Sequence, residues 1–130
     1  MDVVIDTSAL IATIAGEPEK EQIVRLTSGH TLIGPDSIPW EIGNAFSLML
    51  KKGRLNLEEA QQGIAIFQSI PIRYISTDFN SVLALAFKHN MYAYDAYFLD
   101  CTIRHNTPLL TLDRQLVQIA KNCNVTVWEI

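Results

Sequence analysis

The sequence predicts an α/β fold, a three-layer α/β/α sandwich around a central parallel five-stranded sheet. Short runs of apolar and β-branched residues are typical of strands that are covered on both faces. Segments with helical signals separate these runs along the chain. Strands that alternate with helices imply right-handed βαβ crossovers, and therefore parallel pairing.

Length and composition favour one domain over residues 1–130. A chain of 130 residues can bury about two-thirds of its unfolded surface. Hydrophobic residues make up 48% of the chain, which argues against disorder. No apolar run approaches the roughly 18 residues of a membrane helix, and Asp2 stands where a signal peptide carries basic residues. We therefore expect a cytoplasmic protein without a membrane anchor.

The first expected strand, residues 2–5, runs directly into Asp6 and then into a helix over residues 8–15. This order places Asp6 at the carboxyl end of a central strand, where open parallel sheets bind their ligands. The other expected strands cover residues 31–34, 72–76, 108–112 and 125–129.

The remaining helices are expected from their start and stop signals. Gly16 ends the first helix, and the second covers residues 17–28. The longest covers residues 37–52, and the next opens at Asn56 with Glu59 at the capping-box position. These two should form an α-hairpin. Three more helices are expected to open at Asp78, near Tyr94 and at Asp113.

Four acids could meet at one edge of this sheet: Asp6, Glu41, Asp95 and Asp113. Each aspartate, taken alone, is explained as a helix cap. Glu41 is harder to explain, because it lies beside the inward-facing stripe of its helix. Asn44 shares that face one turn later, and Thr111 precedes Asp113 on the same side of its strand.

Carboxylates gathered at one place repel one another unless a cation is present. All-oxygen ligands suit Mg²⁺ or Mn²⁺ rather than zinc. A water activated by such an ion and directed at a phosphodiester is the reaction that this kind of site supports. The net charge of −4 disfavours nucleic-acid binding by itself, but a bound cation would reverse the local sign.

Four motifs carry a resemblance to a known family. They are Val4-Ile5-Asp6-Thr7-Ser8-Ala9-Leu10, Glu41-Ile42-Gly43-Asn44-Ala45, Tyr94-Asp95-Ala96 and Leu110-Thr111-Leu112-Asp113-Arg114. In this order, over nearly the whole chain, they resemble the PIN domain. The chain is most similar to the small VapC-type toxins of bacterial and archaeal toxin–antitoxin pairs.

The resemblance implies a Mg²⁺- or Mn²⁺-dependent endoribonuclease that forms a homodimer and is neutralised by a cognate antitoxin covering the α-hairpin. The implied catalytic and metal-binding residues are Asp6, Glu41, Asp95 and Asp113, with Ser8, Asn44 and Thr111 as supporting polar residues. One departure is Arg114-Gln115, which stands where many relatives have a further acid. It leaves open whether one ion or two is bound. We expect Arg114 to contact phosphate, because it adjoins Asp113.

Other interpretations remain open. A PIN-like scaffold without catalytic activity would use the acids only as helix caps. Phosphoryl transfer onto Asp6 is disfavoured, because Ser8 stands where such hydrolases place a second aspartate. Asp100 is better explained by an ion pair with Arg104, one turn later. The identity of the RNA cannot be predicted from the sequence.

Two further expectations concern the cysteines and histidines, which in other proteins bind metals or take part in redox chemistry. The two cysteines fit no metal or redox spacing, so we expect them to be reduced and in or near the core. The three histidines have no partner spacing for a metal site.

Overall fold

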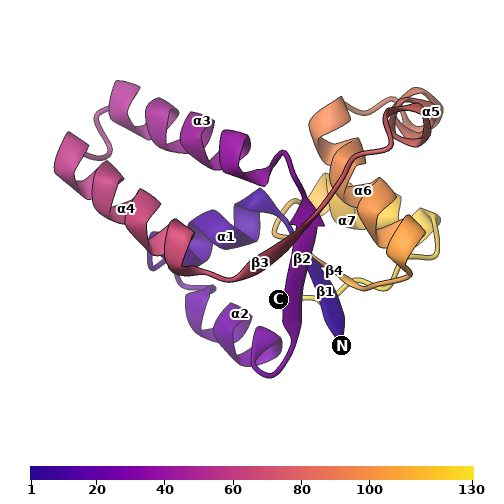
Figure 1. Cartoon of the computed structure of the whole chain (residues 1–130), viewed down its shortest axis with the longest axis horizontal. Coiled ribbons are helices and arrows are strands. Elements are labelled where there is room, and N and C mark those ends of the chain that lie inside the picture. Colours follow the sequence, from indigo (N-terminus) through magenta and orange to yellow (C-terminus); the bar gives the residue numbers. More distant parts are fainter.

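The computed structural model describes residues 1–130 and has a parallel sheet at its centre (Figure 1). Its strands are β1 (Asp2–Ile5), β2 (Thr31–Pro35), β3 (Ile72–Ile75) and β4 (Leu109–Leu110). They are ordered β3-β2-β1-β4, and every pairing is parallel. In the central strand, Val4 pairs with Ile33 on one side and with Leu109 on the other. The predicted fold class is confirmed.

The sheet has four strands rather than the predicted five. The run at residues 125–129 is reduced to an isolated parallel bridge between Leu109 and Val127. The partner strand is too short to support more pairing, because β4 contains only two residues. Beyond it, the N–H groups of Leu112 and Asp113 bond to the hydroxyls of Ser8 and Thr111 instead of to another strand.

Seven helices cover the sheet: α1 (Thr7–Ile14), α2 (Lys20–Thr27), α3 (Ile38–Lys51), α4 (Leu57–Ser69), α5 (Phe79–His89), α6 (Ala93–His105) and α7 (Arg114–Asn122). Helices α1 to α4 lie on one side of the sheet and α5 to α7 on the other (Figure 1). The predicted capping box of α4 is present, with Asn56 and Glu59 each accepting from the other's backbone N–H. None of the helices is long and apolar enough to cross a lipid bilayer.

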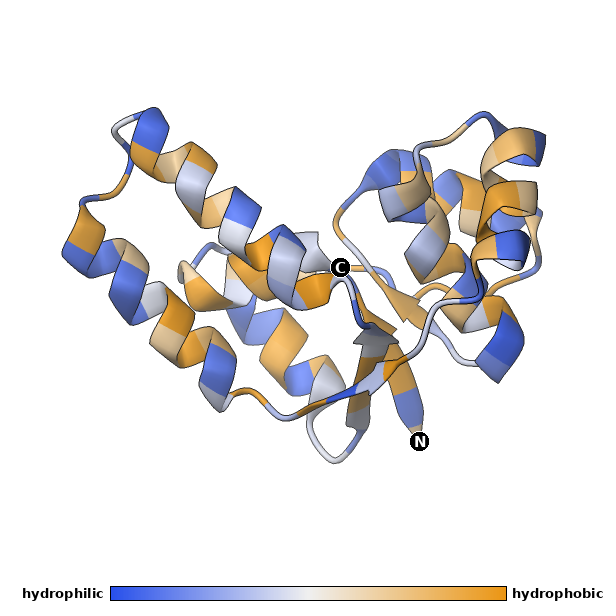
Figure 2. Ribbon diagram, turned by 45° about the horizontal axis from the view of Figure 1, so that its top comes forward, coloured by the Kyte–Doolittle hydropathy of each residue, from blue (hydrophilic) through white to orange (hydrophobic).

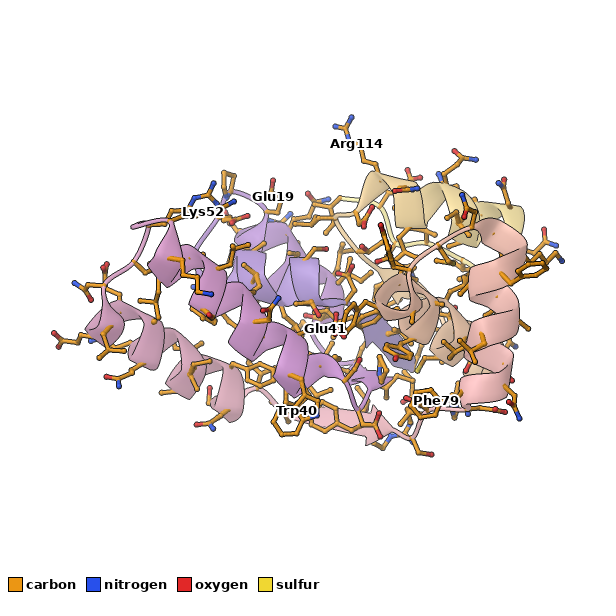
Figure 3. All side chains as sticks on the ribbon, turned by 90° about the horizontal axis from the view of Figure 1, so that it is seen from above. Glu19, Trp40, Glu41, Lys52, Phe79 and Arg114 are labelled. Carbon is orange, nitrogen blue, oxygen red and sulfur yellow. The ribbon has the colours of Figure 1, made fainter.

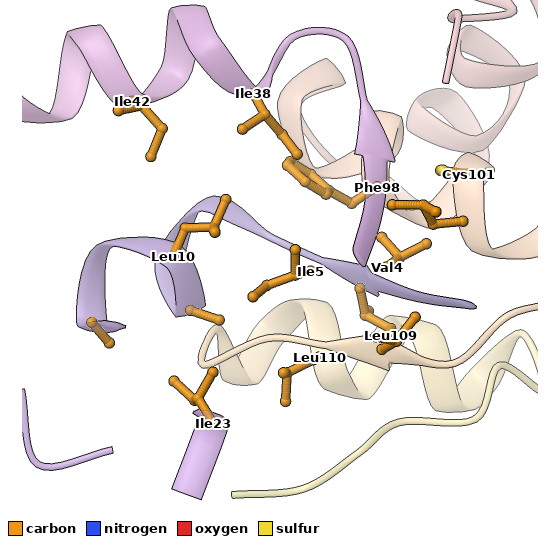
Figure 4. Close-up of a cluster of buried hydrophobic side chains, with 14 of the residues drawn as sticks. Val4, Ile5, Leu10, Ile23, Ile38, Ile42, Phe98, Cys101, Leu109 and Leu110 are labelled. Atoms are coloured by element: carbon orange, nitrogen blue, oxygen red, sulfur yellow. The ribbon is translucent and has the colours of Figure 1, made fainter. Parts of the chain in front are cut away.

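One hydrophobic core of 20 buried residues joins the sheet to its helices. The consecutive β1 residues Val3, Val4 and Ile5 are all buried, because helices cover both faces of the strand. The close-up in Figure 4 shows Ile5 beside Leu10 of α1 and Leu110 of β4. The helices are banded with hydrophilic and hydrophobic residues in Figure 2, as expected for elements with one face on a core.

Both cysteines are free, as the sequence predicted. Cys101 is buried, and burial raises the pKa of its thiol to about 11. Cys123 is partly buried, and its Sγ lies 3.4 Å from Nε2 of His89.

Gly63 of α4 marks the close contact within the α3–α4 hairpin. A Cβ atom at this position would lie 2.5 Å from Cε1 of the buried Phe46. We therefore expect Gly63→Ala to lower the free energy of unfolding by about 1–2 kcal/mol, because the overpacking exceeds the gain in helix propensity. Urea denaturation followed by circular dichroism measures this change.

Gly43 of α3 is the matched control, since a Cβ there would meet nothing within 4 Å. Gly43→Ala should raise the free energy of unfolding by about 0.5–1 kcal/mol, as expected for removing a helical glycine. Equal stabilisation by both substitutions would show that the two helices do not approach closely at Gly63.

Candidate active site

Asp6 lies at the carboxyl end of β1 and caps helix α1. Its side chain is buried, with 5% exposure for the residue. Oδ1 accepts hydrogen bonds from the Ala9 N–H at 3.1 Å and from the Ser8 hydroxyl at 2.7 Å, and Oδ2 accepts from the Thr111 hydroxyl. All of these donors are neutral. The carboxylate therefore has hydrogen-bond partners but no cationic partner.

Burial raises the pKa of Asp6 to about 6, although its hydrogen bonds act in the opposite direction. The neighbouring carboxylate of Asp113 raises this pKa further. An acid that is difficult to ionise, in a site that contains a second acid, is a common property of functional centres.

Glu41 reaches the same region from the first turn of α3. Its Oε1 accepts from the Thr7 hydroxyl at 3.1 Å, and its Oε2 accepts from the Ser37 hydroxyl at 2.6 Å. Figure 3 shows its side chain directed from α3 towards the middle of the molecule. Burial raises the pKa of Glu41, and the charges of Asp6 and Asp95 raise it further.

Asp95 and Asp113 complete the group of acids from the other side of the sheet. Asp95 lies in the first turn of α6, where burial raises its pKa and the charge of Asp113 raises it further. Asp113 caps α7, with Oδ1 accepting from the N–H groups of Gln115 at 3.0 Å and Leu116 at 3.2 Å. The four carboxylates therefore repel one another in pairs. Glu41 is repelled by Asp6 and Asp95, and Asp113 is repelled by the same two aspartates.

Two hydroxyl groups connect Asp6 to the loop between β4 and α7. The Ser8 hydroxyl accepts from the Leu112 N–H at 3.0 Å, and the Thr111 hydroxyl accepts from the Asp113 N–H at 3.0 Å. Their oxygens lie 3.4 Å apart. Each hydroxyl thus contacts both Asp6 and this loop, which fixes the backbone of Asp113 beside β1.

The other two predicted supporting residues lie further from the buried acid. Asn44 is exposed and lines the same cavity as Glu41, one helical turn further along α3. Arg114 is exposed, and in Figure 3 its side chain extends away from the molecule. The structure therefore does not direct the Arg114 guanidinium towards the acids.

Thr7 and Ser37 are site residues that the sequence analysis did not identify. Each donates to one oxygen of Glu41. Thr7 directly follows Asp6, and Ser37 stands four residues before Glu41, one turn earlier. The spacing of Ser37 was a usable signal, whereas the contact of Thr7 depends on how α1 packs against α3.

The donor set fits a hard divalent cation in chemical type. Asp6, Glu41 and Asp113 supply only oxygen ligands, and their mutual repulsion would be relieved by positive charge. No group of three or more His, Cys, Asp or Glu side chains is arranged to hold one ion in this structure. Mg²⁺ is commonly bound by one or two carboxylates and several waters, so a pair of acids suffices.

Asp100, a further buried acid of α6, is separate from this group. Its Oδ2 accepts from Nε of Arg104 at 2.7 Å, and Arg104 also donates to the Ser76 carbonyl at 2.9 Å. The predicted ion pair is confirmed. It attaches α6 to the segment that leads into α5.

Comparison with known proteins identifies relatives over most of the chain. The family model of the PIN domain matches residues 3–122. Ribonuclease VapC3 from Pyrobaculum aerophilum is 30% identical over 126 residues, which cover 91% of this chain and 94% of that protein.

Solved structures share the fold at lower identity. PAE2754 from Pyrobaculum aerophilum matches with a TM-score of 0.74 and 20% identity, over 98% of this chain and 83% of that one. VapBC2 from Rickettsia felis, solved with a DNA fragment from its promoter, matches with a TM-score of 0.72 and 17% identity, over 98% of each chain.

Proposed function

The chain belongs to the PIN-domain family, and we propose that it is a Mg²⁺- or Mn²⁺-dependent endoribonuclease of the cytoplasm, the toxin of a toxin–antitoxin pair. Residues 1–130 form a single PIN-like domain in this proposal, which the single hydrophobic core supports. The observation that carries the proposal is the buried Asp6, whose pKa is raised to about 6 beside further carboxylates. The name of the relative Ribonuclease VapC3 supports RNA as the substrate.

In this proposal, Asp6, Glu41, Asp95 and Asp113 form the catalytic centre. Asp6 with one of its neighbours, Glu41 or Asp113, would hold the divalent ion, and waters would complete its coordination. When bound, such an ion lowers the pKa of a coordinated water and offsets negative charge on the phosphodiester.

The residues around this centre have positioning roles. The Ser8 and Thr111 hydroxyls hold Asp6 in one orientation, and those of Thr7 and Ser37 do the same for Glu41. Burial raises the pKa of Glu41, which makes its carboxylate a stronger base than that of an exposed glutamate.

We propose that an antitoxin covers the α3–α4 hairpin. On this hairpin, the apolar residues Leu57 and Ile66 of α4 are 62% and 47% exposed. Apolar side chains grouped on one surface are typical of protein-binding regions. The solved relative VapBC2 supports a protein partner of this kind. Homodimerisation is the second proposed assembly, supported by the exposed Leu83 and Phe87 on α5.

The alternative is a PIN-like scaffold without catalysis. The hydrogen bonds of Asp6 and Asp113 to helix N-termini are the caps that a scaffold would need. Capping does not explain Glu41, whose carboxylate bonds to two side-chain hydroxyls and accepts no backbone N–H.

Calorimetric titration with MnCl₂ separates the two functions. We expect wild-type protein to bind Mn²⁺ at millimolar concentrations or below, and Asp6→Asn to bind it at least about 10-fold more weakly, because a primary carboxylate ligand is lost. EDTA should stop RNA cleavage by the wild type, and excess Mn²⁺ or Mg²⁺ should restore it. Absence of Mn²⁺ binding, or equal binding by both proteins, would favour the scaffold.

A further inference from the structure

A cavity of about 330 Å³ lies directly beside the candidate catalytic Glu41. It is formed between α3 and the start of α6, and Thr7 contributes from α1. The residues important for its chemistry are Thr7, Trp40, Glu41, Asn44 and Tyr94. The cavity thus combines two aromatic rings with polar groups that belong to the candidate active site or lie next to it.

Trp40 and Tyr94 are unusually exposed for large aromatic residues. Trp40 is 79% exposed and Tyr94 is 63% exposed. Each directly precedes a candidate catalytic acid, Trp40 before Glu41 and Tyr94 before Asp95. Two separate helices therefore bring an aromatic ring to the same cavity, and each ring is covalently close to the acid centre.

The ring of Tyr94 is held in place by its aromatic neighbours. It forms an edge-to-face contact with Tyr97, with ring centroids 5.9 Å apart and an interplanar angle of 83°. Tyr97 forms a similar contact with Phe79 at 6.1 Å and 87°. Such contacts stabilise a defined ring orientation. Tyr94 is therefore an ordered wall of the cavity even though it is mostly exposed.

We propose that this cavity binds one unpaired nucleobase of the RNA, next to the phosphate that is cleaved. The base stacks on the indole of Trp40, with Tyr94 on the wall opposite. The Asn44 amide, which can both donate and accept, reads a hydrogen-bonding edge of the base. This inference rests on the proposed ribonuclease function and specifies its substrate as single-stranded RNA with a preferred base at the cleavage site.

A nucleobase fits the chemistry of the cavity better than a protein segment does. The volume of about 330 Å³ is near the lower limit of small-molecule sites, whereas an amphipathic partner helix needs a longer apolar groove. A base is uncharged, so it can lie beside the carboxylate of Glu41 without electrostatic repulsion. Proteins recognise single-stranded RNA mainly by stacking unpaired bases on aromatic rings and bonding their exposed edges.

Trp40 fluorescence provides a direct test that does not depend on cleavage. The chain has two tryptophans, and Trp128→Phe leaves Trp40 as the only one. Asp6→Asn in the same chain prevents turnover during the titration; wild-type Asp6 with EDTA gives a second format. A single-stranded RNA oligonucleotide should quench Trp40 emission in a saturable way, and the matching RNA duplex should not.

Substitutions then measure how much the ring contributes. Trp40→Ala should weaken single-stranded RNA binding by about 5-fold to 100-fold, the range expected for losing one base–aromatic stack, and Trp40→Phe should restore part of it. Tyr92→Ala is the matched control, because Tyr92 is an aromatic residue that is 84% exposed and does not line the cavity. Asn44→Ala should change the base found next to the cleavage site when the RNA products are sequenced.

Three outcomes would overturn the base-binding site. RNA could bind without quenching Trp40, or Trp40→Ala could leave both affinity and cleavage sequence unchanged. Trp40 emission could instead shift with protein concentration in the absence of RNA, which would show that a second copy of the chain covers the ring. None of these outcomes affects the ribonuclease function itself, which would fail separately if Asp6→Asn protein cleaved RNA at the wild-type rate.

Discussion

Asp6→Asn protein is expected to cleave RNA at least about 100-fold more slowly than wild type, the size of effect seen when a key electrostatic group is removed from an active site. Asn keeps an oxygen that can accept from the Ala9 N–H and the Ser8 hydroxyl, so α1 should remain capped. The substitution removes the charge that would hold a divalent ion while preserving the shape of the side chain. Cleavage of a labelled RNA under single-turnover conditions measures the loss.

Asp78→Asn is the matched control for this experiment. Asp78 caps α5 by accepting from the Ser81 N–H, in the same way that Asp6 caps α1. It is not one of the four candidate catalytic acids. We expect Asp78→Asn to retain the wild-type cleavage rate. Full cleavage by a folded Asp6→Asn protein would contradict the proposed catalytic centre, and so would an equal loss in the Asp78→Asn control.

Without divalent ions, protonation of Asp6 is expected to raise the free energy of unfolding of wild-type protein by about 3 kcal/mol as the pH falls from 7 to below 4. The folded-state pKa of Asp6 is about 6, above its ordinary value of 3.8. The folded protein therefore binds this proton more tightly than the unfolded chain does. The ionised Asp6 carboxylate destabilises the folded protein by its full amount above pH 6. This effect decreases as the pH falls from 6 to 3.8, and it is absent below pH 3.8.

Asp6→Asn isolates this contribution from the titration of other groups. The variant should be more stable than wild type by about 3 kcal/mol at pH 7 in EDTA, and the difference should vanish near pH 4. Urea denaturation at several pH values measures both free energies of unfolding. If the difference in free energy of unfolding did not change with pH, or if wild-type protein were the more stable at pH 7, the pKa of Asp6 would not be raised in the folded protein.

Much of the fold could be predicted, because its signals are local. The apolar run of residues 2–5 before Asp6 gives a buried strand that ends at a helix cap. The capping box at Asn56 also depends on neighbours within three residues. The fifth strand was mispredicted for a different reason: residues 125–129 have strand-like composition, but the length of β4 limits their pairing.

Local sequence patterns were enough to predict the strand and helix order, the cap at Asp6 and the position of Glu41 on one face of a helix, because these features depend on residues within one or two turns of each other. The environment of the acids depends instead on contacts between distant parts of the folded chain. Thr111 bonds to Asp6 across a separation of 105 residues, and Thr7 bonds to Glu41 across 34. Burial and repulsion between carboxylates set the pKa of Asp6, and both depend on distances in the folded chain that no local pattern contains.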